Sequence, residues 1–362
     1  MNKYNFLVLL CLSLSTAACQ KTKPDSTKTA TPETTTENHV TVPKPIDPAQ
    51  KCQDLDQQLK QYIQQGITPK QLITFNTELK ACVAHIPLEQ RYAWLNATDK
   101  LYSKFREQYE SQSLYSYLEL IQPMYEQEIR ESKSPTQHKV MREQLTQKRQ
   151  QALAKLTDQQ RLIVQHLKEL YLDVFCVEGL DFIITQHPRY NTEIFAPHLP
   201  KADQVYLKNA LAEYDGGNVD VDAGLSISFD EVAKRVMIWD KYQSDFPNSH
   251  FYATANENLQ YYRRLLLLGL ENTPVIISYD DPSIFVDPNA LRAITQVSQA
   301  HSSSSPIAQK FLKIIQQNQA AWQQLHTEDV NQETRQQNQQ EFFDKVHKQV
   351  EALLDQADAS TK

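Results

Sequence analysis

The chain has 362 residues, of which 40% are hydrophobic and 22% are charged. This length and apolar content suffice for one large domain or two small ones. Only 6 glycines are present, where a chain of this length usually has about 25. The composition therefore argues against glycine-rich phosphate loops and turn-dense β-sandwiches. The formal net charge is −7, and no basic stripe stands out, which argues against a nucleic-acid partner.

Residues 1–18 have the features of a secretory signal peptide. Lys3 is their only charged residue, and an apolar run from Phe6 to Leu12 is followed by small residues. The apolar run is shorter than the about 20 residues that a bilayer span needs. We therefore expect this segment to be removed on export.

The signal peptide ends in Thr16-Ala17-Ala18-Cys19, which resembles the lipobox of bacterial lipoproteins. Thr16 departs from the leucine that usually stands three residues before the cysteine, and the resemblance covers only the signal. It implies that Cys19 carries acyl chains such as palmitate, so that the lipid bilayer is one partner. Because Gln20 follows instead of aspartate, it also implies an outer-membrane protein of the cell envelope that faces the periplasm. The alternative is a cleaved signal with a chance cysteine.

Residues 19–48 are rich in threonine, proline and balanced charges, with almost no apolar side chains. Such a composition cannot bury enough apolar surface to fold. We expect a lipid-anchored, disordered linker, whose ends would lie on the order of 30 Å apart as a flexible coil.

From Pro48 onward the spacing of apolar residues is mostly helical. A first helix is predicted over 48–65, and the sequence Gly66-Ile67-Thr68-Pro69 is typical of a helix end followed by a new helix start. The next predicted helices cover 69–86, the region after Pro87 with a break at Pro123, 136–155 and 158–177.

The second half is less regular but still mainly helical. In residues 178–202 the apolar side chains follow no regular helical or strand spacing. Residues 275–278 are the best candidate for a strand, but no partner strand is evident. Further helices are predicted over 203–214, from Ser228 to 245, up to Gly269, and from about Ser302 onward. The segment 239–251 is similar to a helix-pair junction of tetratricopeptide modules, but no second copy appears at the 34-residue period.

The last helical stretch has apolar residues at four-three spacing, interrupted by Asn318. One asparagine in such a seam can fix the register of two helices, but we interpret this position as locally hydrated. The predicted fold class is all-α, a bundle of antiparallel amphipathic helices behind the N-terminal tether. We expect a lobe over 49–177 and a lobe over 178–357, or one continuous domain over 49–357.

Cys52 and Cys82 are equidistant from residue 67, inside the predicted turn. Equidistant residues face each other in an antiparallel helix hairpin, and the periplasm is oxidising. We therefore predict a disulfide between them, the alternative being two separate buried thiols.

Cys176 and Glu178, with His187 and His198 nearby in sequence, could supply a thiol nucleophile and a base. The apolar neighbours of Cys176 favour a small buried side chain instead. We therefore predict no catalytic residue here and keep these four as candidates only.

Asp215, Asn218, Asp220 and Asp222 place oxygen side chains in one short segment. Calcium loops use such spacing, because a hard cation takes several oxygen ligands. The segment fails the EF-hand pattern, and a polar helix connection explains it equally well. We expect no bound metal and no cofactor.

These observations favour a non-enzymatic envelope lipoprotein that acts as a helical scaffold or binds a periplasmic partner protein. Two alternatives remain. The chain could be a cell-envelope hydrolase that uses the 176–224 region, or a carrier of an apolar ligand between its helices.

Overall fold

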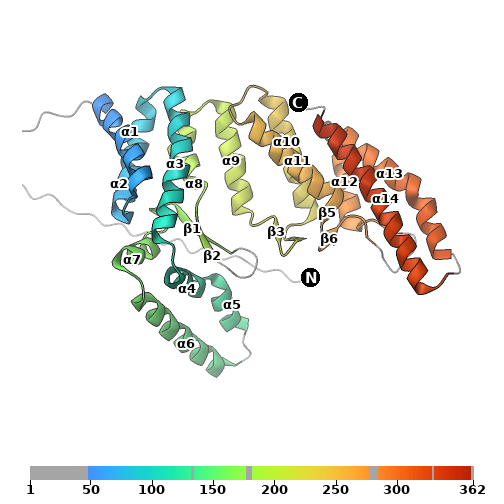
Figure 1. Ribbon diagram of the computed structural model, residues 1–362, viewed down its shortest axis with the longest axis horizontal. Coiled ribbons are helices and arrows are strands. Elements are labelled where there is room, and N and C mark those ends of the chain that lie inside the picture. The colour runs from blue at the N-terminus through green and yellow to red at the C-terminus, as the bar shows by residue number, and fades with distance from the viewer. Residues whose placement is uncertain (1–47, 132–133, 177–181, 278–283, 328–329, 360–362) are drawn as a thin grey trace, which may run out of the picture. The chain divides into compact units, whose positions relative to one another are not determined.

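The computed structural model describes residues 48–131, 134–176, 182–277, 284–327 and 330–359. These ranges are mainly helical, which confirms the all-α class, and their strands form three two-stranded antiparallel hairpins (Figure 1). The predicted signal peptide, Cys19 and all of the linker before Pro48 lie outside the described residues. Among the described helices, none combines the length and the apolar character that a bilayer span requires.

Helices α1 (Pro48–Gln65) and α2 (Pro69–Cys82) form the predicted N-terminal hairpin. Gly66 ends α1 in the left-handed region, with φ of 87°. Thr68 accepts a hydrogen bond from the Gln71 backbone N–H, and the Gln71 side chain accepts one from the Thr68 backbone N–H. This reciprocal capping satisfies two N–H groups that a helix start otherwise leaves without partners.

The hairpin is closed by a disulfide between Cys52 and Cys82, whose Cα atoms are 5.5 Å apart. Both cysteines are buried. The predicted pairing is confirmed, and the alternative of two separate thiols is wrong.

The chain continues through η1 (Val83–His85), α3 (Leu88–Tyr109), α4 (Gln112–Leu120), α5 (Pro123–Glu131), α6 (Pro135–Ala154) and α7 (Asp158–Gln165). The break predicted at Pro123 is present, because α4 ends before it and α5 begins with it. Proline is accepted at a helix start, since the N–H that it lacks would have no partner there.

The helix predicted over 158–177 is wrong beyond Gln165. Strand β1 (Leu172–Cys176) pairs antiparallel with β2 (Phe182–Gln186). Both segments are rich in β-branched and aromatic residues, which fit a pleated surface better than a helix. Tyr171, with φ of 51°, lies just before β1.

The second half contains α8 (Arg189–Ile194), η3 (Ala196–His198), α9 (Lys201–Asp215), β3 (Asp220–Val221), β4 (Gly224–Leu225), α10 (Phe229–Asp245), α11 (Tyr252–Leu268), β5 (Gly269–Leu270), β6 (Thr273–Pro274), α12 (Pro288–Gln299), α13 (Ser305–Thr327) and α14 (Gln332–Ala359). Ser228, where this helix was predicted to begin, caps α10 by accepting a hydrogen bond from the Glu231 backbone N–H. Of the strand expected at 275–278, Ile276 forms an isolated antiparallel bridge with Val286, and residue 278 lies outside the described ranges.

The buried apolar side chains of the described residues form two clusters. The first runs from Cys52 to Leu207 and includes residues of β2, α8 and α9. The second runs from Val232 to Leu354. Tyr206 on α9 packs against both clusters. Whether the chain is best divided into lobes at 178 or treated as one domain over 49–357 stays a prediction.

Helices α13 and α14 pack along the predicted four-three seam, with Phe311, Ile315 and Trp322 buried. Asn318 is only 5% exposed, so the interpretation of a hydrated position is wrong. Its Nδ2 donates to the Ile314 carbonyl at 2.8 Å and to Gln349 Oε1 at 3.0 Å. The asparagine therefore pairs with one position of α14, which favours a single register.

The turn between β3 and β4 places Asp222 and Ala223 in the left-handed region, with φ of 52° and 53°. This conformation costs an alanine roughly 1 kcal/mol that glycine does not pay. We expect Ala223→Gly to raise the free energy of unfolding by about 0.5 kcal/mol, since the greater freedom of glycine in the unfolded chain cancels part of the gain. Urea titration followed by circular dichroism measures the change.

The matched control is Ala212→Gly, at an exposed position of α9. That change should lower stability by about 1 kcal/mol, because alanine is the better helix former. If both variants lose the same free energy of unfolding, the backbone strain assigned to Ala223 is contradicted.

Candidate functional site

The residues considered for a thiol site lie around the β1–β2 hairpin and α8. Cys176 is the last residue of β1, but its side chain and the whole of Glu178 lie outside the described residues. His187 follows β2, and its Nε2 atom is 3.9 Å from Asp215 Oδ1 at the end of α9. Its Nδ1 accepts a hydrogen bond from the Arg189 backbone N–H at 3.0 Å. The fold thus joins two residues that the sequence assigned to different candidate sites.

His198 lies at the end of η3, beside α3. Its backbone carbonyl accepts a hydrogen bond from the Arg91 guanidinium. Burial lowers the pKa of His198, and the nearby Arg91 guanidinium and His85 side chain lower it further. Within the described residues, no hydrogen bond or ion pair joins this histidine to His187.

The residues considered for calcium border the β3–β4 hairpin. The Asn218 carbonyl accepts a hydrogen bond from Ser226 Oγ, and the Asp222 carbonyl accepts one from Asn272 Nδ2. Asp220 is exposed in β3, and Asp215 is exposed at the end of α9. Across the part of the chain that the structure describes, no group of three or more His, Cys, Asp or Glu side chains is arranged to hold a metal ion.

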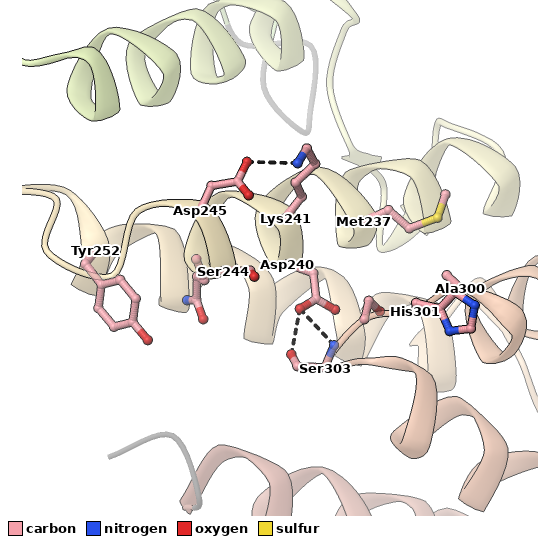
Figure 2. A pocket seen from close by; sticks show the side chains of 11 residues that line it. Met237, Asp240, Lys241, Ser244, Asp245, Tyr252, Ala300, His301 and Ser303 are labelled. Carbon is pink, nitrogen blue, oxygen red and sulfur yellow. Dashed lines mark hydrogen bonds and ion pairs between the residues drawn. The ribbon is translucent and has the colours of Figure 1, made fainter.

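A cavity of about 690 Å³ lies between α10 and the loop from α12 to α13. We call it the Asp240 cleft. Figure 2 shows Asp240 directed towards Ser303, while Lys241 and Asp245 form an ion pair of 2.9 Å along α10. His301 lines the loop side of the cleft and is exposed.

Asp240 accepts hydrogen bonds from Ser303 Oγ at 2.6 Å and from the backbone N–H groups of Ser303 and Ser304 at 3.2 and 2.8 Å. Burial acts to raise the pKa of Asp240, but the hydrogen bonds from the two serines outweigh it, so the pKa lies below its usual value. The carboxylate is therefore ionised at neutral pH and is a weak proton acceptor. Its contacts hold the loop rather than prepare a general base.

Arg263 of α11 contacts the same two serines and is only 3% exposed. Its Nε donates to Ser304 Oγ at 2.8 Å, and its Nη2 donates to Ser303 Oγ at 2.6 Å. Asp240, the two serines and Arg263 thus form a continuous hydrogen-bonded chain. It connects α10 and α11 to the start of α13.

A second polar cluster surrounds Glu213 on α9. Its Oε1 accepts from Trp239 Nε1 at 2.5 Å, and its Oε2 accepts from the Tyr262 hydroxyl at 3.0 Å. Arg235 Nη1 donates to the same hydroxyl at 3.1 Å. Burial raises the pKa of Glu213, and these hydrogen bonds and the Arg235 charge offset part of the rise. The cluster joins α9 to α10 and α11.

A third cluster is centred on Asp203, which is 1% exposed. We call it the Asp203 lock. Its Oδ2 accepts from the Tyr92 hydroxyl, and its Oδ1 accepts from Ser249 Oγ at 2.7 Å and from the His250 backbone N–H at 3.2 Å. The Tyr92 and His250 rings stack with centroids 3.9 Å apart. The lock connects α3 and α9 to the turn between α10 and α11.

Asp203, Glu213, Asp240 and Arg263 were not recognisable as members of polar clusters from the sequence alone. The sequence signal for such a cluster is an ionisable residue on the inward face of a helix, such as Asp240 one turn after Val236. That pattern does not identify the hydrogen-bond partner, which lies on another helix or in a loop that is distant in sequence. Comparisons with protein-family models, with characterised proteins and with solved structures find no match to this chain.

Proposed function

We propose that the chain is a lipid-anchored envelope protein whose helical body binds a partner protein in the periplasm. Acylated Cys19 would hold it at the outer membrane, and residues 19–48 would act as the tether. The sequence of the signal supports the anchor, and the surface of α6 supports the binding of a partner.

Most residues of helix α6 are exposed to solvent. Of its 20 residues, Leu145 and Ala152 are buried, while Val140 is 46% exposed. Arg149 holds the helix in place, donating from Nε to the Leu120 carbonyl at 2.8 Å and pairing with Glu126 Oε1 at 3.0 Å. A long helix that is fixed at one side and open on the other offers a preformed surface to a partner.

The buried polar clusters support a scaffold rather than a reactive site. The carboxylates of Asp203, Glu213 and Asp240 each accept hydrogen bonds from side chains of other helices or loops. Fully partnered buried groups rigidify a fold. A rigid body orders few groups on binding, so it loses little conformational entropy when a partner docks.

Changing Cys19 to alanine tests the anchor. We expect loss of labelling by radioactive palmitate and release of the protein from the membrane fraction, because an acidic body has no electrostatic attraction to an anionic bilayer. Stable anchoring takes at least two acyl chains, and the cysteine is the proposed site of all of them. If the variant is still processed and stays in the membrane pellet after a high-salt wash, Cys19 is not the anchor.

Photo-cross-linking tests the α6 surface. We would place p-benzoylphenylalanine at Val140 and, as a matched control, at exposed Lys313 on α13. Irradiation of intact cells should give an adduct of one defined mass from position 140 and none from position 313. Absence of an adduct from position 140, or the same adducts from both positions, would refute binding through α6.

A further inference from the structure

A cavity of about 390 Å³ lies where the start of α13 meets α11 and the end of α14. We call it the Arg263 cavity. Its polar part is lined by Arg263, Ser303 and Lys310, and its apolar part by Ile307 of α13 and Leu353 of α14. No carboxylate is among the described residues that line it.

One nitrogen of the Arg263 side chain is not used by the protein. Nε and Nη2 donate to Ser304 and Ser303, as described above. Nη1 has no acceptor among the described residues, and it is not one of the polar atoms that the described part of the fold buries without a partner. Solvent therefore reaches Nη1, although the residue as a whole is only 3% exposed. Because Arg263 lines the cavity, Nη1 is the donor that it offers to a ligand there.

The guanidinium charge of Arg263 is buried without a direct counter-ion. The side chain forms no ion pair with any residue that the structure describes, and the Asp240 carboxylate is connected to it only through the two serines. Burial lowers the pKa of Arg263, and the charges of Asp240 and Asp358 raise it without cancelling the effect. Charged side chains are almost never fully buried unless they are paired. The position therefore favours an anion at the open nitrogen.

The lining of the cavity indicates which anion fits. Lys310 lines the same cavity and forms no ion pair within the described ranges, so a guanidinium nitrogen and an ammonium group are both open to an acceptor. A carboxylate offers two oxygens to such donors and carries one negative charge. The negative charge of nearby Asp358 acts against a second charge on the ligand, which disfavours a phosphate ester. The apolar side chains of Ile307 and Leu353 suit an aliphatic group beside the carboxylate.

We propose that the Arg263 cavity binds a monocarboxylate that carries an aliphatic group. Arg263 Nη1 and Lys310 contact the carboxylate oxygens, and the aliphatic group packs against Ile307 and Leu353. A fatty acid and the C-terminus of a peptide that ends in an aliphatic residue share this chemistry. The site does not involve α6 and goes beyond the function proposed above.

Isothermal titration calorimetry on the full, detergent-solubilised protein tests the proposal, with hexanoate as the first probe and a titration into detergent alone as the blank. We expect saturable binding that weakens as salt is added. Hexanamide keeps the aliphatic chain but has no charge, so it should bind roughly tenfold more weakly. N-acetylalanylleucine presents the carboxylate as the C-terminus of a peptide, so the tighter of the two carboxylates identifies the source.

Three variants locate the site. Lys310→Gln should weaken the binding of hexanoate roughly fivefold, since it removes one charge contact. Arg263→Lys keeps a positive charge but lacks Nη1, so it should weaken binding roughly tenfold. Lys313→Gln is the control, because Lys313 is exposed on the same helix as Lys310 but does not line the cavity. Circular dichroism verifies that the variants fold, and Lys310→Gln, at an exposed position, tests the site even if Arg263→Lys does not fold.

Absence of saturable binding by both carboxylates would overturn the proposal. Unchanged affinity in the Lys310→Gln variant, or an equal loss in Lys313→Gln, would place the ligand elsewhere and overturn it as well. If hexanamide binds as tightly as hexanoate, the cavity recognises only the aliphatic chain, and the role of Arg263 is refuted.

Discussion

Replacing Asp203 with alanine should lower the free energy of unfolding by about 3 to 5 kcal/mol. The carboxylate accepts from Tyr92, Ser249 and His250 and is almost completely buried. Alanine leaves these donors without an acceptor in a place where little water can replace it. The loss should exceed that of an ordinary buried hydrogen bond, because a charged acceptor binds its donors more strongly than a neutral one.

Two further variants separate the contributions within the Asp203 lock. Tyr92→Phe removes one donor and keeps the ring that stacks on His250, so we expect a loss of about 1 to 2 kcal/mol. Asp203→Asn keeps one oxygen acceptor and should fall between Tyr92→Phe and Asp203→Ala. Urea titrations followed by circular dichroism give all three values, and a loss below about 1 kcal/mol for Asp203→Ala would show that the lock contributes little.

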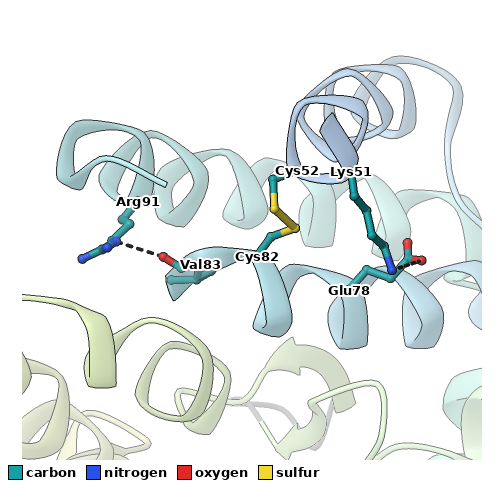
Figure 3. Close-up of a disulfide and its surroundings, with 6 residues drawn as sticks. All are labelled: Lys51, Cys52, Glu78, Cys82, Val83 and Arg91. Atoms are coloured by element: carbon teal, nitrogen blue, oxygen red, sulfur yellow. Dashed lines mark hydrogen bonds and ion pairs between the residues drawn. A yellow bond between two sulfur atoms is a disulfide. The ribbon is translucent and has the colours of Figure 1, made fainter. Parts of the chain in front are cut away.

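Breaking the bond between Cys52 and Cys82 should cost about 3 to 4 kcal/mol. The bond closes a loop of 30 residues, and without it the unfolded chain gains the entropy of that loop. Figure 3 shows the bond joining α1 to the end of α2, next to the Lys51–Glu78 ion pair of 3.4 Å between the same helices. Because the bond ties α1 to α2, the amide protons of α1 should exchange faster after reduction.

The measurement compares urea midpoints with and without reductant. A variant with both Cys52→Ala and Cys82→Ala is the control, since its midpoint should not respond to reductant and should match that of the reduced protein. If reductant leaves the wild-type midpoint unchanged, or shifts the double variant equally, the disulfide is not the source of the stability.

Local signals in the sequence predicted much of the architecture. The segment from Gly66 to Pro69 needs only its own backbone angles and capping groups to end one helix and begin another. The pairing of Cys52 with Cys82 followed from that turn, because a hairpin relates residues at equal distances from its centre. In these cases the residues that decide the structure lie within one or two helical turns of each other, or are related by a single short turn.

Other features depended on contacts between segments that are distant in sequence. The segment before Cys176 has a helical spacing of apolar residues, yet it pairs with β2, because a hairpin satisfies backbone groups and packs β-branched side chains together. Asn318 is compatible with a hydrated surface until α14 places Gln349 beside it. Asp203 and Asn76 are single polar residues on otherwise ordinary helices. Only the tertiary structure decides that the first receives three donors and that the second has a buried oxygen with no donor among the residues that the structure describes. The reason is that hydrogen bonding depends on atoms that neighbouring segments bring within about 3 Å.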